Sequence, residues 1–201
     1  SFGHTGEIHN GADDNASGVS ELLETIQAFA STGLSSRRSI LFAFWDGEEA
    51  GMVGSKHWLA NPTLPLDRIK MAITIDMVGR LREGRLQVLG TRSGYGLRRL
   101  WSGPVDDPLW LDFSWELSAN SDHWGFLERR VPIIVFHTGL HKDYHRPGDD
   151  IEKINSEGMR EIGRYLLAML VTVGNADTLR AYLGFLDLRC TQDRVSQAVA
   201  D

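Results

Sequence analysis

The chain has 201 residues, 42% of them hydrophobic and 24% charged, which is typical of one folded domain and argues against a disordered chain. Its apolar runs fall far short of the roughly 20 residues that cross a bilayer, so we expect no membrane span. The net charge of -6 argues against nucleic-acid binding, and the single cysteine, Cys190, excludes an intramolecular disulfide and a cysteine-rich zinc site.

The predicted elements alternate between helices and strands. A loop rich in glycine and histidine precedes a helix that we expect to begin at Asp14 or Asn15 and to bury Val19, Leu22 and Leu23 among other apolar residues. Further helices are predicted at residues 55–59, 95–102, 122–128 and 156–173, and strands at residues 39–45, 70–76, 85–90, 109–115 and 131–137. The alternation predicts an α/β sandwich of three layers, with residues 1–201 forming a single domain.

Acidic side chains stand where predicted strands end. The strand at residues 39–45 runs into Asp46-Gly-Glu-Glu49, the next strand ends on Asp76, and Asp13-Asp-Asn15 opens the first helix. Ligands of α/β sheets bind beyond the carboxyl ends of the strands. Because like charges in one crevice resist joint ionisation, we expect a divalent cation there.

A histidine completes this set of groups. His145 follows the predicted strand at residues 131–137, and zinc takes both imidazole nitrogen and carboxylate oxygen. Of two adjacent glutamates, one can bind metal while the other accepts a proton. Taken singly, these residues also fit a helix cap, a solvated acidic loop and a surface histidine. Their placement at one sheet edge is what favours a zinc site.

Five motifs occur in order: Gly11-Ala-Asp-Asp-Asn-Ala-Ser-Gly18, Phe44-Trp-Asp-Gly-Glu-Glu-Ala-Gly51 with Gly54-Ser55, Ile75-Asp-Met-Val-Gly79, Ser121-Asp-His123 and Asp143-Tyr-His-Arg-Pro-Gly-Asp149. Together they resemble the signatures of the di-zinc aminopeptidases, a group related more distantly to glutamate carboxypeptidase II, transferrin receptor ectodomains and glutaminyl cyclases. The resemblance runs from about His9 to Gly158. It implies a mixed, mostly parallel sheet and a hydrolase that cleaves peptide or protein N-termini. Family habit also implies an extracytoplasmic location.

The resemblance assigns roles to individual residues. It makes Asp14 the carboxylate that bridges two zinc ions. Glu49 and His145 complete one metal site, and Asp76 binds the other ion. Glu48 becomes the general base that takes a proton from the metal-bound water.

Supporting residues receive looser roles. Tyr144 is a candidate donor to the oxyanion, although a packed aromatic with a solvated hydroxyl explains it equally well. Asp13 and Asp122 are candidates to orient ligating groups, and a helix N-cap also explains Asp122. His123 and His137 receive no metal role.

The sequence departs from the family at one point. The family has a further histidine ligand in a His-x-Asp motif before the Gly-Ala-Asp-Asp segment, and no such motif precedes Asp14. We therefore expect a chain that begins just after that motif, lacks the first strands of the sheet and holds one zinc ion or fewer tightly.

Two alternatives follow from this departure. One is a single-zinc glutaminyl cyclase, an acyltransferase for which Asp14, Glu49 and His145 suffice; the retained Asp76 argues against it. The other is a catalytically incomplete binding domain of the same fold. The retained Glu48 argues against that alternative, because a scaffold has no need of a general base.

Overall fold

The computed structural model describes residues 6–103, 109–114 and 116–179, so Cys190 lies outside the described residues. The helices are α1 (Gly18–Thr32), α2 (Val53–Ala60), α3 (Leu97–Trp101), α4 (His123–Glu128) and α5 (Ser156–Asn175). The strands are β1 (Ala72–Ile75), β2 (Arg85–Leu89), β3 (Trp110–Ser114) and β4 (Ile133–His137). Short helical turns occupy Ala12–Ser17, Leu66–Arg68 and Ile151–Lys153. Each of these helices and strands matches a segment predicted from the sequence, and the boundaries differ by only a few residues.

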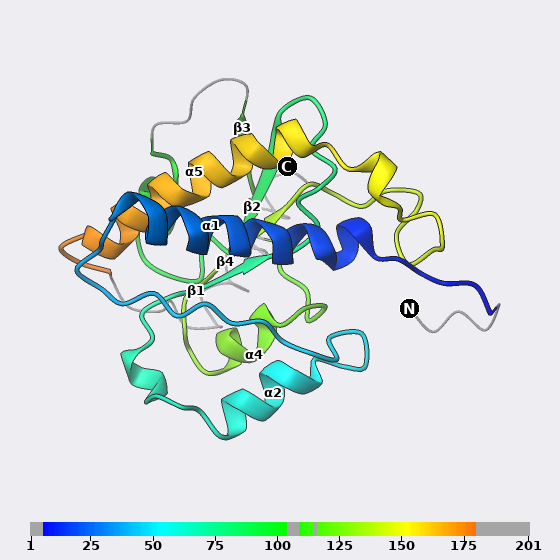
Figure 1. Cartoon of the computed structure of the whole chain (residues 1–201). Coiled ribbons are helices and arrows are strands. Elements are labelled where there is room, and N and C mark those ends of the chain that lie inside the picture. The colour runs from blue at the N-terminus through cyan, green and yellow to red at the C-terminus, as the bar shows by residue number, and fades with distance from the viewer. Residues whose placement is uncertain (1–5, 104–108, 115, 180–201) are drawn as a thin grey trace, which may run out of the picture.

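The four strands form one mixed sheet in the order β1-β4-β2-β3. β1 runs parallel to β4, β2 runs parallel to β3, and the β2–β4 pair is antiparallel. Helices α1 and α5 cover one side of the sheet and α2 and α4 the other, which confirms the three-layer arrangement (Figure 1). The carboxyl ends of β1 and β4 meet at one edge, and this edge carries the candidate site.

Strand β4 shows why the sheet needs helices on both faces. Ile134 and Phe136 belong to the core shared with α3 and α5, where the Phe136 ring meets Trp101 edge-on at a centroid distance of 5.3 Å. The alternate residues Ile133 and Val135 belong to the second core, under α2 and α4. Because successive side chains of a strand point to opposite faces, a strand buried on both sides is a continuous apolar run.

Residues 39–45 do not form a strand, and that prediction is wrong. Within the described part of the chain they have no ladder partner, and Leu41 and Phe44 are 58% and 47% exposed. A groove of about 530 Å³ lies between residues 43–45 and β1, and Val19 of α1 also lines it. An apolar run becomes a strand only where a neighbouring strand satisfies its backbone, and here the groove separates the run from the sheet.

The fully buried positions of helix α1 are polar or small. Gly18, Glu21 and Thr25 are its buried positions, whereas Val19 and Leu23 are largely exposed. The carboxylate of Glu21 lies against Gly163 of α5, in space that a side chain at residue 163 would otherwise occupy. The prediction that Val19 and Leu23 face the core is therefore wrong, whereas Leu22 and Phe29 of the same helix do pack against it.

Glu21 should make stability depend on pH. Burial, reinforced by the Glu24 carboxylate, raises the pKa of Glu21 to about 7 from 4.5. Its favourable contribution is complete below pH 4.5 and is lost as pH rises through 7, because ionisation costs more in the folded chain. We expect Glu21→Gln to melt like the wild type at pH 4 and about 5 °C higher at pH 8 in thermal denaturation. The exposed Glu152→Gln variant should change neither value, and a lower melting temperature for Glu21→Gln at pH 8 would contradict this account.

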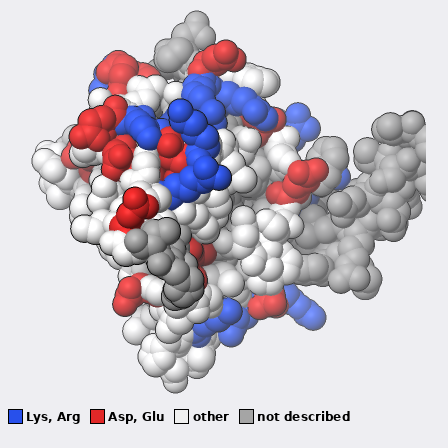
Figure 2. All heavy atoms as spheres, turned by 90° about the vertical axis from the view of Figure 1, so that its right-hand side faces the viewer, with Lys and Arg blue, Asp and Glu red and all other residues white. Residues whose placement is uncertain are grey.

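The surface carries charges of both signs. On the face shown in Figure 2, basic and acidic side chains are interspersed above a largely uncharged area. Among the helices of the described residues, none combines the length and apolar character needed to cross a membrane.

Candidate metal centre

Three predicted metal ligands converge at the sheet edge. Nε2 of His145 lies 3.1 Å from Oδ2 of Asp14 and 3.0 Å from Oε1 of Glu49. Asp14 comes from the turn Ala12–Ser17, Glu49 from the loop before α2, and His145 from the loop after β4. One ligand atom from each residue lies within 4.8 Å of the others. Two carboxylates and an imidazole form a donor set that fits zinc.

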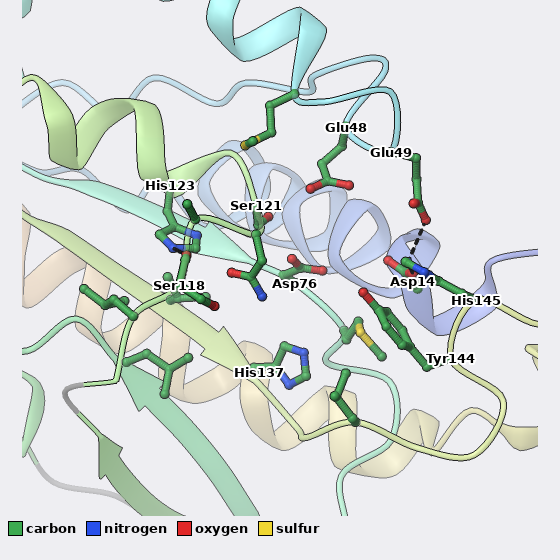
Figure 3. Close-up of a pocket in the computed structure, with 18 of the residues that line it drawn as sticks. Asp14, Glu48, Glu49, Asp76, Ser118, Ser121, His123, His137, Tyr144 and His145 are labelled. Carbon is green, nitrogen blue, oxygen red and sulfur yellow. Dashed lines mark hydrogen bonds and ion pairs between the residues drawn. The ribbon is translucent and has the colours of Figure 1, made fainter. Parts of the chain in front are cut away.

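Asp76 and Glu48 lie beside this cluster without belonging to it. Asp76 directly follows β1 and is hydrogen-bonded to Ser121. Both acids line the same pocket as the three ligands, and Figure 3 shows the carboxylates of Glu48, Asp76 and Asp14 directed into it. The structure therefore brings all four predicted ligand positions and the predicted base together, with Asp76 outside the tight group of three.

The gathered carboxylates oppose one another electrostatically. Burial, together with Asp76 and Glu49, raises the pKa of Asp14 to about 6. Burial, then Asp76 and other nearby acids, raises the pKa of Glu48 to about 7, and burial also raises the pKa of Asp76. Each shift means that a negative charge is disfavoured in this pocket unless a positive charge joins it. A divalent cation would supply that charge.

Tyr144 lies directly against a candidate ligand. Its ring stacks on His145 with centroids 3.7 Å apart, and its hydroxyl points towards the carboxylates (Figure 3). Burial and the negative charges around it raise the pKa of Tyr144 to about 12. The hydroxyl therefore keeps its proton at neutral pH and can donate a hydrogen bond.

The backbone around Asp14 is tied to the end of β1 by Asn15. The Asn15 amide donates to the carbonyl of Ile75 at 3.0 Å, and its Oδ1 accepts from the N–H groups of Gly18 and Met77 at 3.1 Å. A side chain at Gly18 would collide with the same Ile75 carbonyl. The motif's final glycine therefore allows the turn to approach the strand closely.

Asp13 is fully buried and anchors the same turn. Its Oδ1 accepts from the N–H of Gly79 at 2.6 Å, and its Oδ2 lies 3.1 Å from Nε2 of His141. His141 is a residue that the sequence did not single out. The sequence feature that could have identified His141 is its position four residues before His145. A histidine in a loop does not by itself indicate a function.

Arg80 joins the two loops that carry the candidate ligands. Its guanidinium contacts Oδ1 of Asp149 at 2.8 Å and Oδ2 of Asp143 at 3.5 Å. The other oxygen of Asp149 accepts from the N–H groups of Asp13 and Asp14 at 2.9 and 3.0 Å. The two acids that Arg80 contacts belong to the loop after β4, whereas Arg80 lies in the loop after β1, and Asp143 immediately precedes Tyr144. Sequence reasoning missed Arg80, because a lone arginine after a motif resembles any surface arginine.

Asp122 does not act as a capping residue. It occupies the N-cap position of α4 but makes no capping hydrogen bond through its side chain. Its carboxylate instead accepts a hydrogen bond from Ser55, which belongs to the Gly54-Ser55 motif. Asp122 also contributes to the raised pKa of Glu48.

Comparison with known proteins now identifies the class. Residues 2–170 match the model of Peptidase family M28, and the chain therefore belongs to this family of metallopeptidases. It is 29% identical to aminopeptidase YwaD of Bacillus subtilis (strain 168), over 79% of this chain and 36% of that protein. The resemblance to aminopeptidases that the motifs carry is thereby confirmed.

Solved structures agree on the fold. The zinc aminopeptidase BSAP from Bacillus subtilis matches with a TM-score of 0.70 and 25% identity, over 88% of this chain and 46% of that one. A glutaminyl cyclase from Porphyromonas gingivalis matches with a TM-score of 0.58 and 18% identity, over 81% and 63%. The chain thus spans less than half the length of these two aminopeptidases.

Proposed function

We propose that the protein is a zinc-dependent aminopeptidase that removes the first residue of a peptide. The observation that carries this proposal is the convergence of Asp14, Glu49 and His145 beside Glu48 in one pocket. When bound there, zinc would polarise the scissile carbonyl and acidify a water molecule. Membership of the M28 family and the similarity to aminopeptidases support the same reaction.

Different residues of the chain have different roles in the proposed hydrolysis. Glu48 takes the proton of the attacking water and passes it to the leaving amine, a task suited to a carboxylate of raised proton affinity. Asp14, Glu49 and His145 would hold the metal, and Asp76 would bind a second ion. Tyr144 donates a hydrogen bond from its hydroxyl group to the developing oxyanion.

Zinc binding tests the ligand set directly. We expect the metal-free chain to take up one tightly bound zinc ion, measured by equilibrium dialysis and elemental analysis. His145→Ala should weaken binding by about 100-fold or more, because it removes the nitrogen ligand. The matched control His57→Ala changes an exposed histidine on α2 and should bind like the wild type. Equal affinity of His145→Ala and wild type would rule out this ligand set.

A glutaminyl cyclase-like acyltransferase is the second candidate. It is favoured by the tight group of three ligands, which leaves Asp76 outside, and by the similarity in fold. Mass spectrometry of a peptide with N-terminal glutamine, incubated with the zinc-loaded chain, separates the two reactions. Release of free glutamine supports the aminopeptidase, whereas loss of ammonia from an otherwise intact peptide supports the cyclase.

A further inference from the structure

The pocket at the metal centre has both polar and apolar side chains in its wall. The whole pocket has a volume of about 290 Å³. Its apolar walls are formed by Met52, Met77, Leu89, Val135 and Leu140, and Glu116, Ser118, Asn120 and Ser121 also line it. Leu89 and Val135 belong to paired strands, so the pocket ends against the sheet. A substrate held at the ligands would place its first side chain between these apolar walls.

One of the two histidines that line this pocket besides His145 directs a ring N–H into it. His137 is the last residue of β4, and Figure 3 shows its ring directed into the pocket. Its Nδ1 accepts the N–H of Gly139 at 2.7 Å, so this nitrogen carries no proton. Burial lowers the pKa of His137, which keeps the ring neutral at pH 7. The single ring proton therefore resides on Nε2, for which the described residues provide no hydrogen-bond acceptor.

The pocket's other histidine does not offer such a donor. Nε2 of His123 lies 3.1 Å from the carbonyl of Ser118 and donates to it. Its Nδ1 is buried and has no hydrogen-bond partner in the described chain. Of the two ring N–H groups, only that of His137 has no hydrogen-bond acceptor within the described residues.

We propose that His137 is a specificity-determining residue that selects substrates whose first residue carries a carboxamide, asparagine or glutamine. This inference rests on the proposed aminopeptidase function. The apolar walls contact the aliphatic stem, and Nε2–H of His137 donates to the amide oxygen. An apolar side chain would displace water from that donor without replacing its hydrogen bond, which costs affinity. Acidic side chains are repelled by Glu48 and Glu116, which line the same pocket and are not among the proposed metal ligands.

Binding of near-isosteric amides to the zinc-loaded chain tests the proposal. The pairs are asparaginamide with leucinamide and glutaminamide with methioninamide, titrated by calorimetry. We expect the carboxamide member to bind about tenfold more tightly. His137→Phe keeps a ring but removes the donor, so it should abolish the preference. His137→Gln restores an N–H donor and should retain it, and the control His57→Phe should bind like the wild type.

The outcomes separate this inference from the proposed function. Equal binding within each pair, tighter binding of the apolar member, or no measurable binding of either overturns the role of His137. So does a preference that survives in His137→Phe. Failure of the aminopeptidase function appears differently: the carboxamide preference is present while aminoacyl p-nitroanilides remain uncleaved.

Discussion

Glu48→Gln is expected to lower kcat for an aminoacyl p-nitroanilide by about 10³-fold while the zinc content stays unchanged. Gln has nearly the same shape as Glu but cannot accept the proton of the attacking water. Glu48 lies outside the group of Asp14, Glu49 and His145, so the metal should remain bound. Steady-state rates and elemental analysis of the same preparation provide the two measurements.

The exposed Glu152→Gln variant is the matched control and should retain the wild-type rate. Loss of zinc from Glu48→Gln would indicate that Glu48 is a metal ligand and not the general base. A wild-type rate with zinc retained would contradict the proposed mechanism.

Arg80→Met should cause the largest loss of stability among the variants considered. It leaves the Asp149 carboxylate, which is 2% exposed, without its cation. Breaking a buried ion pair by removing one partner costs about 3 kcal/mol or more. We expect urea denaturation of the metal-free chain at pH 7 to show a decrease of this size in the free energy of unfolding. Zinc affinity should drop as well, by about tenfold, because Asp149 holds the backbone of Asp14.

The pH dependence of this variant has a defined sign. Burial alone would raise the pKa of Asp149, but the N–H of Asp14 and the Arg80 guanidinium outweigh burial and lower it. Such a group contributes stability above the ordinary value of 3.8, and that stability is lost as pH falls through the lowered pKa. The difference in the free energy of unfolding between wild type and Arg80→Met should therefore be largest at pH 7 and should decrease at acidic pH.

Arg82→Met is the control, because Arg82 is exposed and donates to the carbonyl of Leu140 at the surface. It should leave both stability and zinc affinity unchanged. Equal losses in the two arginine variants would contradict a specific role for Arg80.

Periodicity and motif order predicted much of this molecule. Strands such as Ile133–His137 are apolar because both faces are buried, and this property is visible in the sequence. The positions of Asp14, Glu49, Asp76 and His145 beyond predicted elements indicated one common edge, where the structure places them. Their roles towards zinc stay predictions that the proposed experiments test.

The remaining features depend on contacts that a single sequence does not display. Glu21 is buried because Gly163, on another helix, leaves space for it. Residues 39–45 have the composition of a strand, but strand formation needs a neighbour as well. Arg80 gains its importance from Asp149, and no local pattern links two residues so far apart in the chain.

The long-range ties around Asp14 couple metal binding to folding. Asp14 and the Asp149 carboxylate that holds its N–H are 135 residues apart, so an unfolded chain has no preformed site. A ligand that binds only the native state stabilises it by mass action, and each tenfold rise in free zinc above the dissociation constant adds about 1.4 kcal/mol. Zinc binding therefore increases the population of the native state. Removal of zinc by a chelator should unfold the least stable variants first.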